Sequence, residues 1–199
     1  MEFFHRAPGR PSRLGVLPGS FNPPTIAHLA LASAASPWVD EVVFVVPRTF
    51  PHKPYTGATF AERVEMLRHA CHGQPSFSIA ASDQGLFVDI ARECRAAYGE
   101  AVELTFLCGR DAAERIASWD YGRPEAFAEM LERFHLLVAA RHGEYVAPRQ
   151  FAHAIRHLPV TGDLDPVSSS EVRRRIADGD RWEHLVPNPI RETVQAIYS

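Results

Sequence analysis

The first residues with a chemically suggestive pattern lie in a turn that begins at Gly19 and ends at His28. The turn follows the apolar run 14–17 and precedes a helix-like stretch, so Gly19 and Ser20 lie where a predicted strand passes into a helix. Backbone amides at such a turn can bind phosphate. Thr25 and His28 are three residues apart at the start of the helix and can face one pocket. A plain turn with a helix-capping threonine and a surface histidine is the alternative interpretation.

Near residue 170, three serines and an arginine form a second pattern. The serines are Ser168, Ser169 and Ser170, and they begin a predicted helix that ends at Gly179. Free amides and hydroxyls at a helix N-terminus bind anions, and Arg173 follows on the first turn. Ser168 and Glu171 also have the spacing of a capping box, and capping and anion binding can hold together.

A third group of candidates lies in and after the loops that follow two predicted strands. Lys53 lies in a loop rich in proline and aromatic residues, where its ammonium group could neutralise a phosphate or be solvated. Gly109 permits close approach of a ligand to the backbone. Asp111 could cap a helix. Trp119 offers a flat face to a flat ring, although a tryptophan buried in the core fits the sequence nearly as well.

Alternating strands and helices must position these residues. We expect strands at residues 14–17, 41–46, 77–81, 102–108, 135–140 and 155–160. We expect helices at residues 26–35, 60–71, 87–98, 111–118, 124–134, 168–179 and 189–198, the second preceded by a capping box of Thr59 and Glu62. This order indicates a doubly wound α/β fold with a mainly parallel sheet, whose ligands bind at the carboxyl ends of the strands.

Composition narrows the class of protein. With 199 residues, 46% of them hydrophobic, we expect a flexible leader over residues 1–13 and a single domain over residues 14–199 that includes a C-terminal helical part. A net charge of −3 and the lack of a long apolar run argue against nucleic-acid or membrane binding. Three separated cysteines without a CxxC pair predict a cytoplasmic protein with no metal site of its own. A homo-oligomer is possible.

The stretch GSFNPPTIAHL from Gly19 resembles the signature of nucleotidylyltransferases, a glycine turn followed by (H/T)xxH at the start of the first helix. Over roughly residues 14–199 the chain is more closely similar to the nicotinate and nicotinamide mononucleotide adenylyltransferases. Further motifs follow in the family's order: FPHK at 50–53, GRD at 109–111, Trp119, VSSSEVR at 167–173 and LVP at 185–187.

The resemblance implies a Rossmann-like nucleotidyltransferase fold and transfer of AMP from ATP to nicotinate or nicotinamide mononucleotide, with release of pyrophosphate, in NAD biosynthesis. It implies Mg²⁺ bound mainly through the ATP phosphates. The implied catalytic residues are His28, Thr25, Lys53 and Arg173. Those implied for ATP are Gly19, Ser20, Phe21, His28, Gly109, Asp111 on the ribose, Ser168, Ser169, Ser170 and Arg173. Those implied for the mononucleotide are Asn22, Lys53 and Trp119.

Two positions differ from the family pattern and keep alternatives open. Thr25 replaces the first histidine of the bacterial HxGH motif, and residues 85–89 lack a counterpart of the tyrosine-threonine stretch that recognises the pyridine. Another phosphorylated acceptor, such as phosphopantetheine, or the use of CTP is therefore an alternative within the fold. A non-catalytic nucleotide-binding protein is the alternative of another class.

Overall fold

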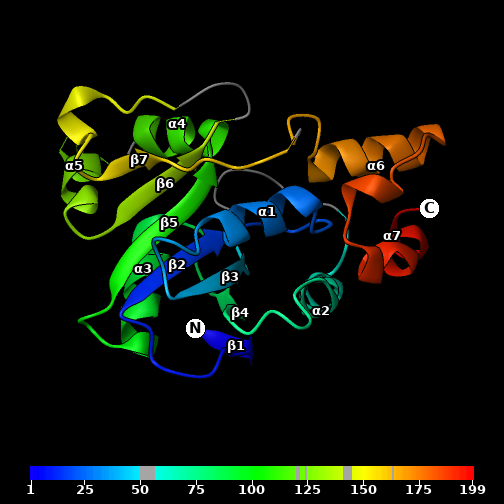
Figure 1. Ribbon diagram of the computed structural model, residues 1–199, viewed down its shortest axis with the longest axis horizontal. Coiled ribbons are helices and arrows are strands. Elements are labelled where there is room, and N and C mark those ends of the chain that lie inside the picture. Colours follow the sequence, from blue (N-terminus) through cyan, green and yellow to red (C-terminus); the bar gives the residue numbers. More distant parts are fainter. Residues whose placement is uncertain (50–56, 120–121, 124, 141–144, 163) are drawn as a thin grey trace.

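The computed structural model describes residues 1–49, 57–119, 122–123, 125–140, 145–162 and 164–199 (Figure 1). A single sheet has the strand order β1-β4-β3-β2-β5-β6-β7, and every neighbouring pair except β1 and β4 is parallel. The strands are β1 Glu2–His5, β2 Arg13–Pro18, β3 Glu41–Pro47, β4 Phe77–Ser82, β5 Glu103–Gly109, β6 His135–Ala139 and β7 Ile155–His157. The predicted α/β fold class is confirmed.

Helices connect the parallel strands. They are α1 Ile26–Ala34, α2 Phe60–Ala70, α3 Phe87–Tyr98, α4 Arg110–Ser118, α5 Ala126–Leu131, α6 Ser169–Asp178 and α7 Arg191–Tyr198. The α5 helix and the β7 strand are shorter than predicted, and a 3₁₀ turn at Asn188–Ile190 precedes α7. None of the helices in the described ranges has the length and apolar character needed to cross a membrane.

Both faces of the sheet are covered, as β3 illustrates. All seven of its residues are buried. Val43 and Val45 pack in the cluster that α3, α4 and α5 cover, whereas Val42 and Phe44 pack in the cluster beneath α1 and α2. The apolar run in the sequence thus marks a central strand with helices on both sides.

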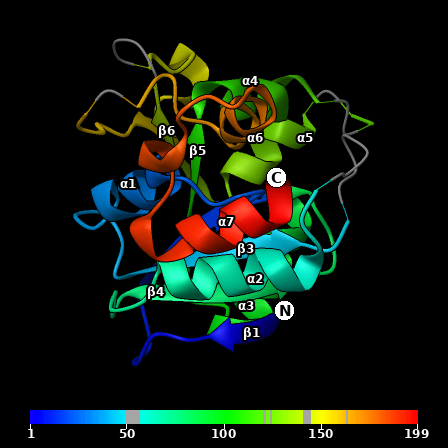
Figure 2. The same cartoon turned by 90° about the vertical axis from the view of Figure 1, so that its right-hand side faces the viewer.

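The C-terminal helices form a smaller apolar cluster with the outer side of α2. Met66 of α2, Val172 of α6 and Val194 of α7 are fully buried in it. Figures 1 and 2 show α6 and α7 gathered at one end of the molecule, with α7 lying alongside α2. This packing brings the C-terminal part of the chain beside the loop that follows β2.

The expectation of a flexible leader is wrong for residues 2–5. They form β1, which pairs antiparallel with β4 at the edge of the sheet. Phe3 packs edge-on against Tyr98 and Phe4 against Phe60, with ring centroids 5.6 and 5.8 Å apart. The two phenylalanines pack on opposite faces of the sheet edge, and this packing holds the segment in place. The segment is too short for its sequence pattern to indicate a strand.

The strand order reverses between β2 and β5. From β2 the chain moves through β3 to β4 on one side, and it then returns to build β5, β6 and β7 on the other side. Loops that leave such a switch point diverge and open a crevice at the carboxyl ends of the strands. The turn at Gly19 follows β2 and the turn at Gly109 ends β5, so the fold itself directs both turns to this crevice.

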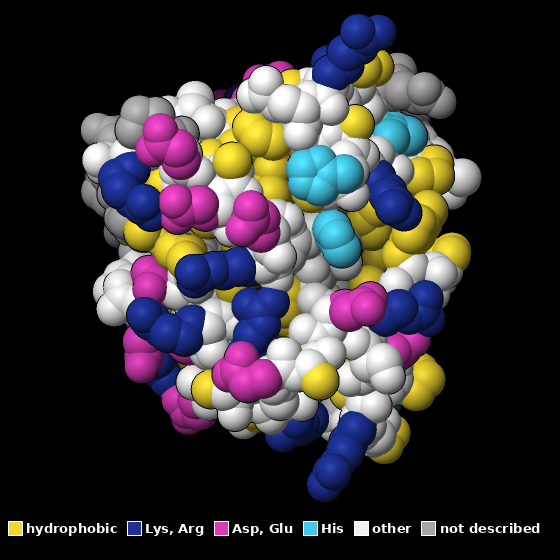
Figure 3. Space-filling model, turned by 90° about the vertical axis from the view of Figure 1, so that its left-hand side faces the viewer, with side chains coloured by type: hydrophobic (Ala, Val, Ile, Leu, Met, Phe, Trp, Pro, Cys, Tyr) yellow, Lys and Arg dark blue, Asp and Glu magenta, His cyan; other side chains and the backbone are white. Residues whose placement is uncertain are grey.

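The surface shown in Figure 3 carries charged side chains of both signs. On the side shown in Figure 3, basic and acidic side chains are interspersed and do not separate into patches of one sign.

Candidate active site

Two adjoining hollows occupy the crevice at the switch point. The α4 pocket, of about 320 Å³, lies between the end of β2, the start of α3 and one side of α4. The α6 pocket, of about 240 Å³, lies between the start of α1, the end of β6 and the N-terminus of α6. Both are lined by His28, Leu31 and Gly109. The histidine predicted to act on phosphate therefore lies where two binding spaces meet.

His28 has a defined protonation state. Its Nδ1 accepts a hydrogen bond from the backbone N–H of Thr25 at 2.9 Å, and Thr25 Oγ1 lies 2.8 Å from the same nitrogen. Because a backbone N–H can only donate, the ring proton lies on Nε2. Burial lowers the pKa of His28 to about 4. At neutral pH the ring is uncharged and its remaining polar group, Nε2–H, is a hydrogen-bond donor.

Thr25 orients this histidine. The residue is 1% exposed and stands at the N-cap of α1, so its backbone and side chain are both fixed by the helix start. The prediction that Thr25 and His28 share one pocket is consistent with the geometry, since both line the α6 pocket. The Thr25 hydroxyl contacts the ring nitrogen, so Thr25 positions the ring of His28.

The turn that begins at Gly19 packs against the ring of His28. Gly19 and Ser20 line the α4 pocket, and a Cβ at Gly19 would lie 2.9 Å from the ring of Phe21. Phe21 has a positive φ of 48° and is fully buried. Its ring lies edge-on to His28, with centroids 5.1 Å apart. The structure thus places the Phe21 side chain in the core under His28, outside the lining of both pockets, and its predicted contact with ATP stays a prediction.

Asn22 is also turned away from both pockets. It is 4% exposed, and its Oδ1 accepts hydrogen bonds from the Ala58 N–H and the Tyr198 hydroxyl. The side chain of Asn22 lines neither described pocket, and its predicted contact with the mononucleotide stays a prediction. The motif fixed the position of the residue in the loop, but the direction of its side chain depends on α7, far away in the sequence.

Arg173 and Ser169 fasten α6 to the same loop. The guanidinium of Arg173 donates to the carbonyl of Asn22 and, at 3.3 Å, to that of Ser169, and Ser169 Oγ donates to the carbonyl of Pro23 at 2.8 Å. Arg173 lines neither pocket among the described residues. It holds the backbone of the loop that follows β2.

The N-terminus of α6 faces the α6 pocket. Ser168 and Ser169 line that pocket, and Ser170 is exposed outside it. Ser168 Oγ accepts from the Glu171 N–H at 3.1 Å, which is half of the predicted capping box. The other half is absent here because the Glu171 carboxylate binds Arg174 and Arg175. The helix start still presents backbone N–H groups to an anion.

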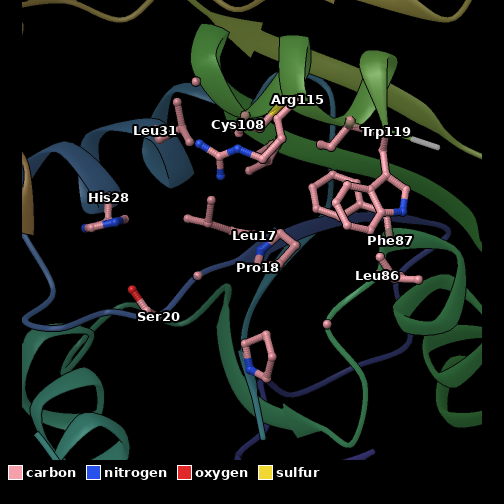
Figure 4. Close-up of a pocket in the computed structure, with 17 residues that line it drawn as sticks. Leu17, Pro18, Ser20, His28, Leu31, Leu86, Phe87, Cys108, Arg115 and Trp119 are labelled. Carbon is pink, nitrogen blue, oxygen red and sulfur yellow. The ribbon is translucent and has the colours of Figure 1, made fainter. Parts of the chain in front are cut away.

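The residues expected around β5 and α4 divide between the pockets and the surface. Gly109 lines both pockets, and a Cβ there would meet no atom within 4 Å, so its missing side chain keeps the junction open. Trp119 ends α4, is 37% exposed and forms the far wall of the α4 pocket with Leu86 and Phe87 (Figure 4). Asp111 is exposed on the first turn of α4 and lines neither pocket.

Lys53, the other residue predicted for phosphate, lies outside the described residues. A different cation was missed by the sequence analysis. Arg115, on α4, lines the α4 pocket and is the only ionised side chain in the described lining of that pocket. Its spacing of four residues from Trp119 places the two on one helix face, and this spacing was the available signal.

Two pockets that meet at a helix-start histidine, at the switch point of a doubly wound sheet, are typical of a nucleotide-binding enzyme. A family model described as cytidylyltransferase-like matches residues 16–175. The chain therefore belongs to the cytidylyltransferase-like family, on the branch of the nicotinate-nucleotide adenylyltransferases, and it is a nucleotidyltransferase.

The names of individual relatives support this assignment. A probable nicotinate-nucleotide adenylyltransferase of Exiguobacterium sibiricum is 30% identical, over 92% of this chain and 96% of the relative. One of Geotalea daltonii is 30% identical over 94% and 98% of the two chains. The structure of Plasmodium falciparum nicotinic acid mononucleotide adenylyltransferase complexed with NaAD covers 93% of each chain with a TM-score of 0.66 at 17% identity, which shows a shared fold.

Proposed function

We propose that the protein transfers the adenylyl group of ATP to nicotinate mononucleotide, releasing pyrophosphate and forming the dinucleotide used in NAD biosynthesis. One observation carries the proposal: two pockets of separate character meet at His28, which lines both of them. A reaction that joins two nucleotides needs such a junction between two binding spaces. The names of the relatives favour nicotinate over nicotinamide as the pyridine.

We assign the mononucleotide to the α4 pocket and ATP to the α6 pocket. The aromatic end of the α4 pocket, at Trp119 and Phe87, suits a flat pyridine ring. The N-terminus of α6 suits the ATP phosphates, because its amides and helix dipole favour negative charge. In this arrangement the two phosphate groups that react come together at His28 and Gly109.

The chemistry asks little of the protein beyond alignment and charge stabilisation. A phosphate oxygen of the mononucleotide is already ionised and forms a bond to the α-phosphorus of ATP. The bond from that phosphorus to the bridging oxygen breaks, and pyrophosphate leaves with the electron pair. His28 need not act as a base, and its Nε2–H donates to the transferring phosphate, where negative charge develops.

Mg²⁺ fits this site as an ion carried by ATP. In the described part of the chain, no group of three or more His, Cys, Asp or Glu side chains could hold a metal, and Asp165 is the one carboxylate that lines either pocket. When bound through the ATP phosphates, the ion would neutralise charge on them. The residues of the chain align the two substrates and donate hydrogen bonds.

The test is pyrophosphate release from ATP and Mg²⁺ with nicotinate mononucleotide or nicotinamide mononucleotide in parallel reactions. CTP in place of ATP tests another nucleotide donor. Phosphopantetheine in place of the pyridine mononucleotide tests another acceptor. We expect turnover with ATP and nicotinate mononucleotide, and a loss of about 100-fold or more in kcat for His28→Ala with folding preserved. His72→Ala, at a histidine outside both pockets, is the matched control.

Each other outcome refutes a defined part of the proposal. Activity with a control substrate alone keeps the fold and discards the role in NAD biosynthesis. ATP binding without turnover, unchanged by His28→Ala, identifies a non-catalytic binding protein.

A further inference from the structure

The α4 helix forms one wall of the α4 pocket along its whole length. Its residues Ala112, Arg115, Ile116 and Trp119 line the pocket at spacings of three and four, so they form one stripe on the helix. Gly109, just before the helix, lies at the junction with the α6 pocket, and Trp119 lies at the opposite, aromatic end. The stripe therefore runs from the place of reaction to the place proposed for the pyridine.

Arg115 lies between these two ends. Trp119 lies four positions further along the helix, which is about 6 Å along the axis. Helical side chains lean toward the N-terminus of their helix, which here means toward Gly109 and His28. Figure 4 shows the guanidinium directed toward the side of His28 and Leu31 and away from Trp119. The charge thus lies on the His28 side of the aromatic wall.

No hydrogen bond or ion pair within the described structure engages the guanidinium of Arg115. Arg115 is exposed and makes no side-chain hydrogen bond or ion pair with the residues that the structure describes. Most other arginines on the described helices are paired, as Arg92 is with Asp89 and Arg174 with Glu171. The other charged groups of α4 do not line the pocket.

A mononucleotide needs a cation at this place. Its phosphate carries between one and two negative charges near neutral pH and must approach the phosphates of ATP. The neutral ring of His28 supplies a donor but no charge. An arginine fork can bind two oxygens of one phosphate and leave the third free to react.

We propose that Arg115 binds the 5′-phosphate of the mononucleotide and holds its nucleophilic oxygen beside His28. The inference rests on the proposed function, since it names a contact to that acceptor. It assigns the phosphate of the acceptor to α4 and leaves the phosphates of ATP to α6.

Steady-state kinetics of Arg115→Ala and Arg115→Lys test this assignment. Loss of a charged hydrogen bond to phosphate predicts a KM for nicotinate mononucleotide raised about tenfold or more in Arg115→Ala. The KM for ATP stays within about twofold, and Arg115→Lys recovers part of the loss because it keeps the charge. Arg92→Ala is the matched control: it removes the same charge from an exposed helical site that lines neither pocket.

The riboside of nicotinate, which lacks the phosphate, supplies a second readout as a competitive inhibitor. We expect its inhibition constant to be the same for the wild type and Arg115→Ala. An equal rise for riboside and mononucleotide overturns the phosphate contact, and so does a loss seen with nicotinate but not nicotinamide mononucleotide, which indicates the pyridine carboxylate. Turnover with an unchanged KM refutes this inference alone, whereas wild-type silence with both mononucleotides refutes the proposed function as well.

Discussion

The protonation state of His28 makes stability depend on pH in a calculable way. An unfolded histidine has a pKa of 6.5, and burial in the folded protein lowers that of His28 to about 4. Between these values the unfolded chain binds a proton that the folded chain does not bind. The contribution of His28 is therefore complete above pH 6.5 and is lost as the pH falls toward 4. The difference in pKa corresponds to about 3 kcal/mol of unfolding free energy.

The assay is urea unfolding of the wild type and His28→Asn from pH 4 to pH 8. Asparagine does not titrate in this range, and its side-chain oxygen can accept from the Thr25 N–H as Nδ1 does. Each protein contains other histidines, so the informative quantity is the difference between the two free energies at each pH. We expect that difference to shift against the wild type by up to about 3 kcal/mol as the pH falls from 7 to 4.

A direct measurement separates the histidine from the rest of the protein. In the NMR spectrum the His28 ring should titrate with a midpoint near 4 and carry its proton on Nε2 above that pH. A free-energy difference that does not change with pH, together with a His28 midpoint near 6.5, would refute the picture of a desolvated neutral donor.

Three further results are expected. Thr25→Val keeps the shape and removes the hydroxyl beside Nδ1, so kcat should fall about fivefold, equivalent to about 1 kcal/mol, with little change in either KM, and steady-state kinetics measure it. Gly109→Ala should raise the KM of both substrates, because its Cβ enters the open junction, while urea unfolding changes by less than about 1 kcal/mol. Burial raises the pKa of Cys71, Cys94 and Cys108 to about 12, so a thiol reagent at pH 8 should label none of them in the native protein and all of them in urea; rapid native labelling would contradict this burial.

Local patterns predicted the elements well because burial imposes a period on the sequence. The buried run 41–46 became β3, and the Thr59 and Glu62 capping box begins α2 with both reciprocal hydrogen bonds. Thr25 and His28 were placed in one pocket by their spacing at a helix start, and the structure brings them into contact. These inferences needed only neighbours along the chain.

The direction of loop side chains could not be predicted in the same way. The positive φ of Phe21 sends its ring into the core, and Asn22 turns toward Tyr198, which is 176 residues away in the sequence. Arg115 gave no motif, and its place became evident only when α4 was seen to run beside the crevice. Contacts set by tertiary packing decide these roles.

The hydrogen bonds that hold the loop after β2 have a consequence for the order in which the protein folds during its synthesis. Three hydrogen bonds hold residues 22–23 from Ser169, Arg173 and Tyr198, which the ribosome makes long after the strands β2 to β5. Domains begin to fold while they are being synthesised, so the sheet can form before these late residues emerge. A nascent chain halted before residue 169 would carry every residue of the glycine turn and yet lack the contacts that set its shape. Competence to bind substrates would then be acquired as a final step of biosynthesis.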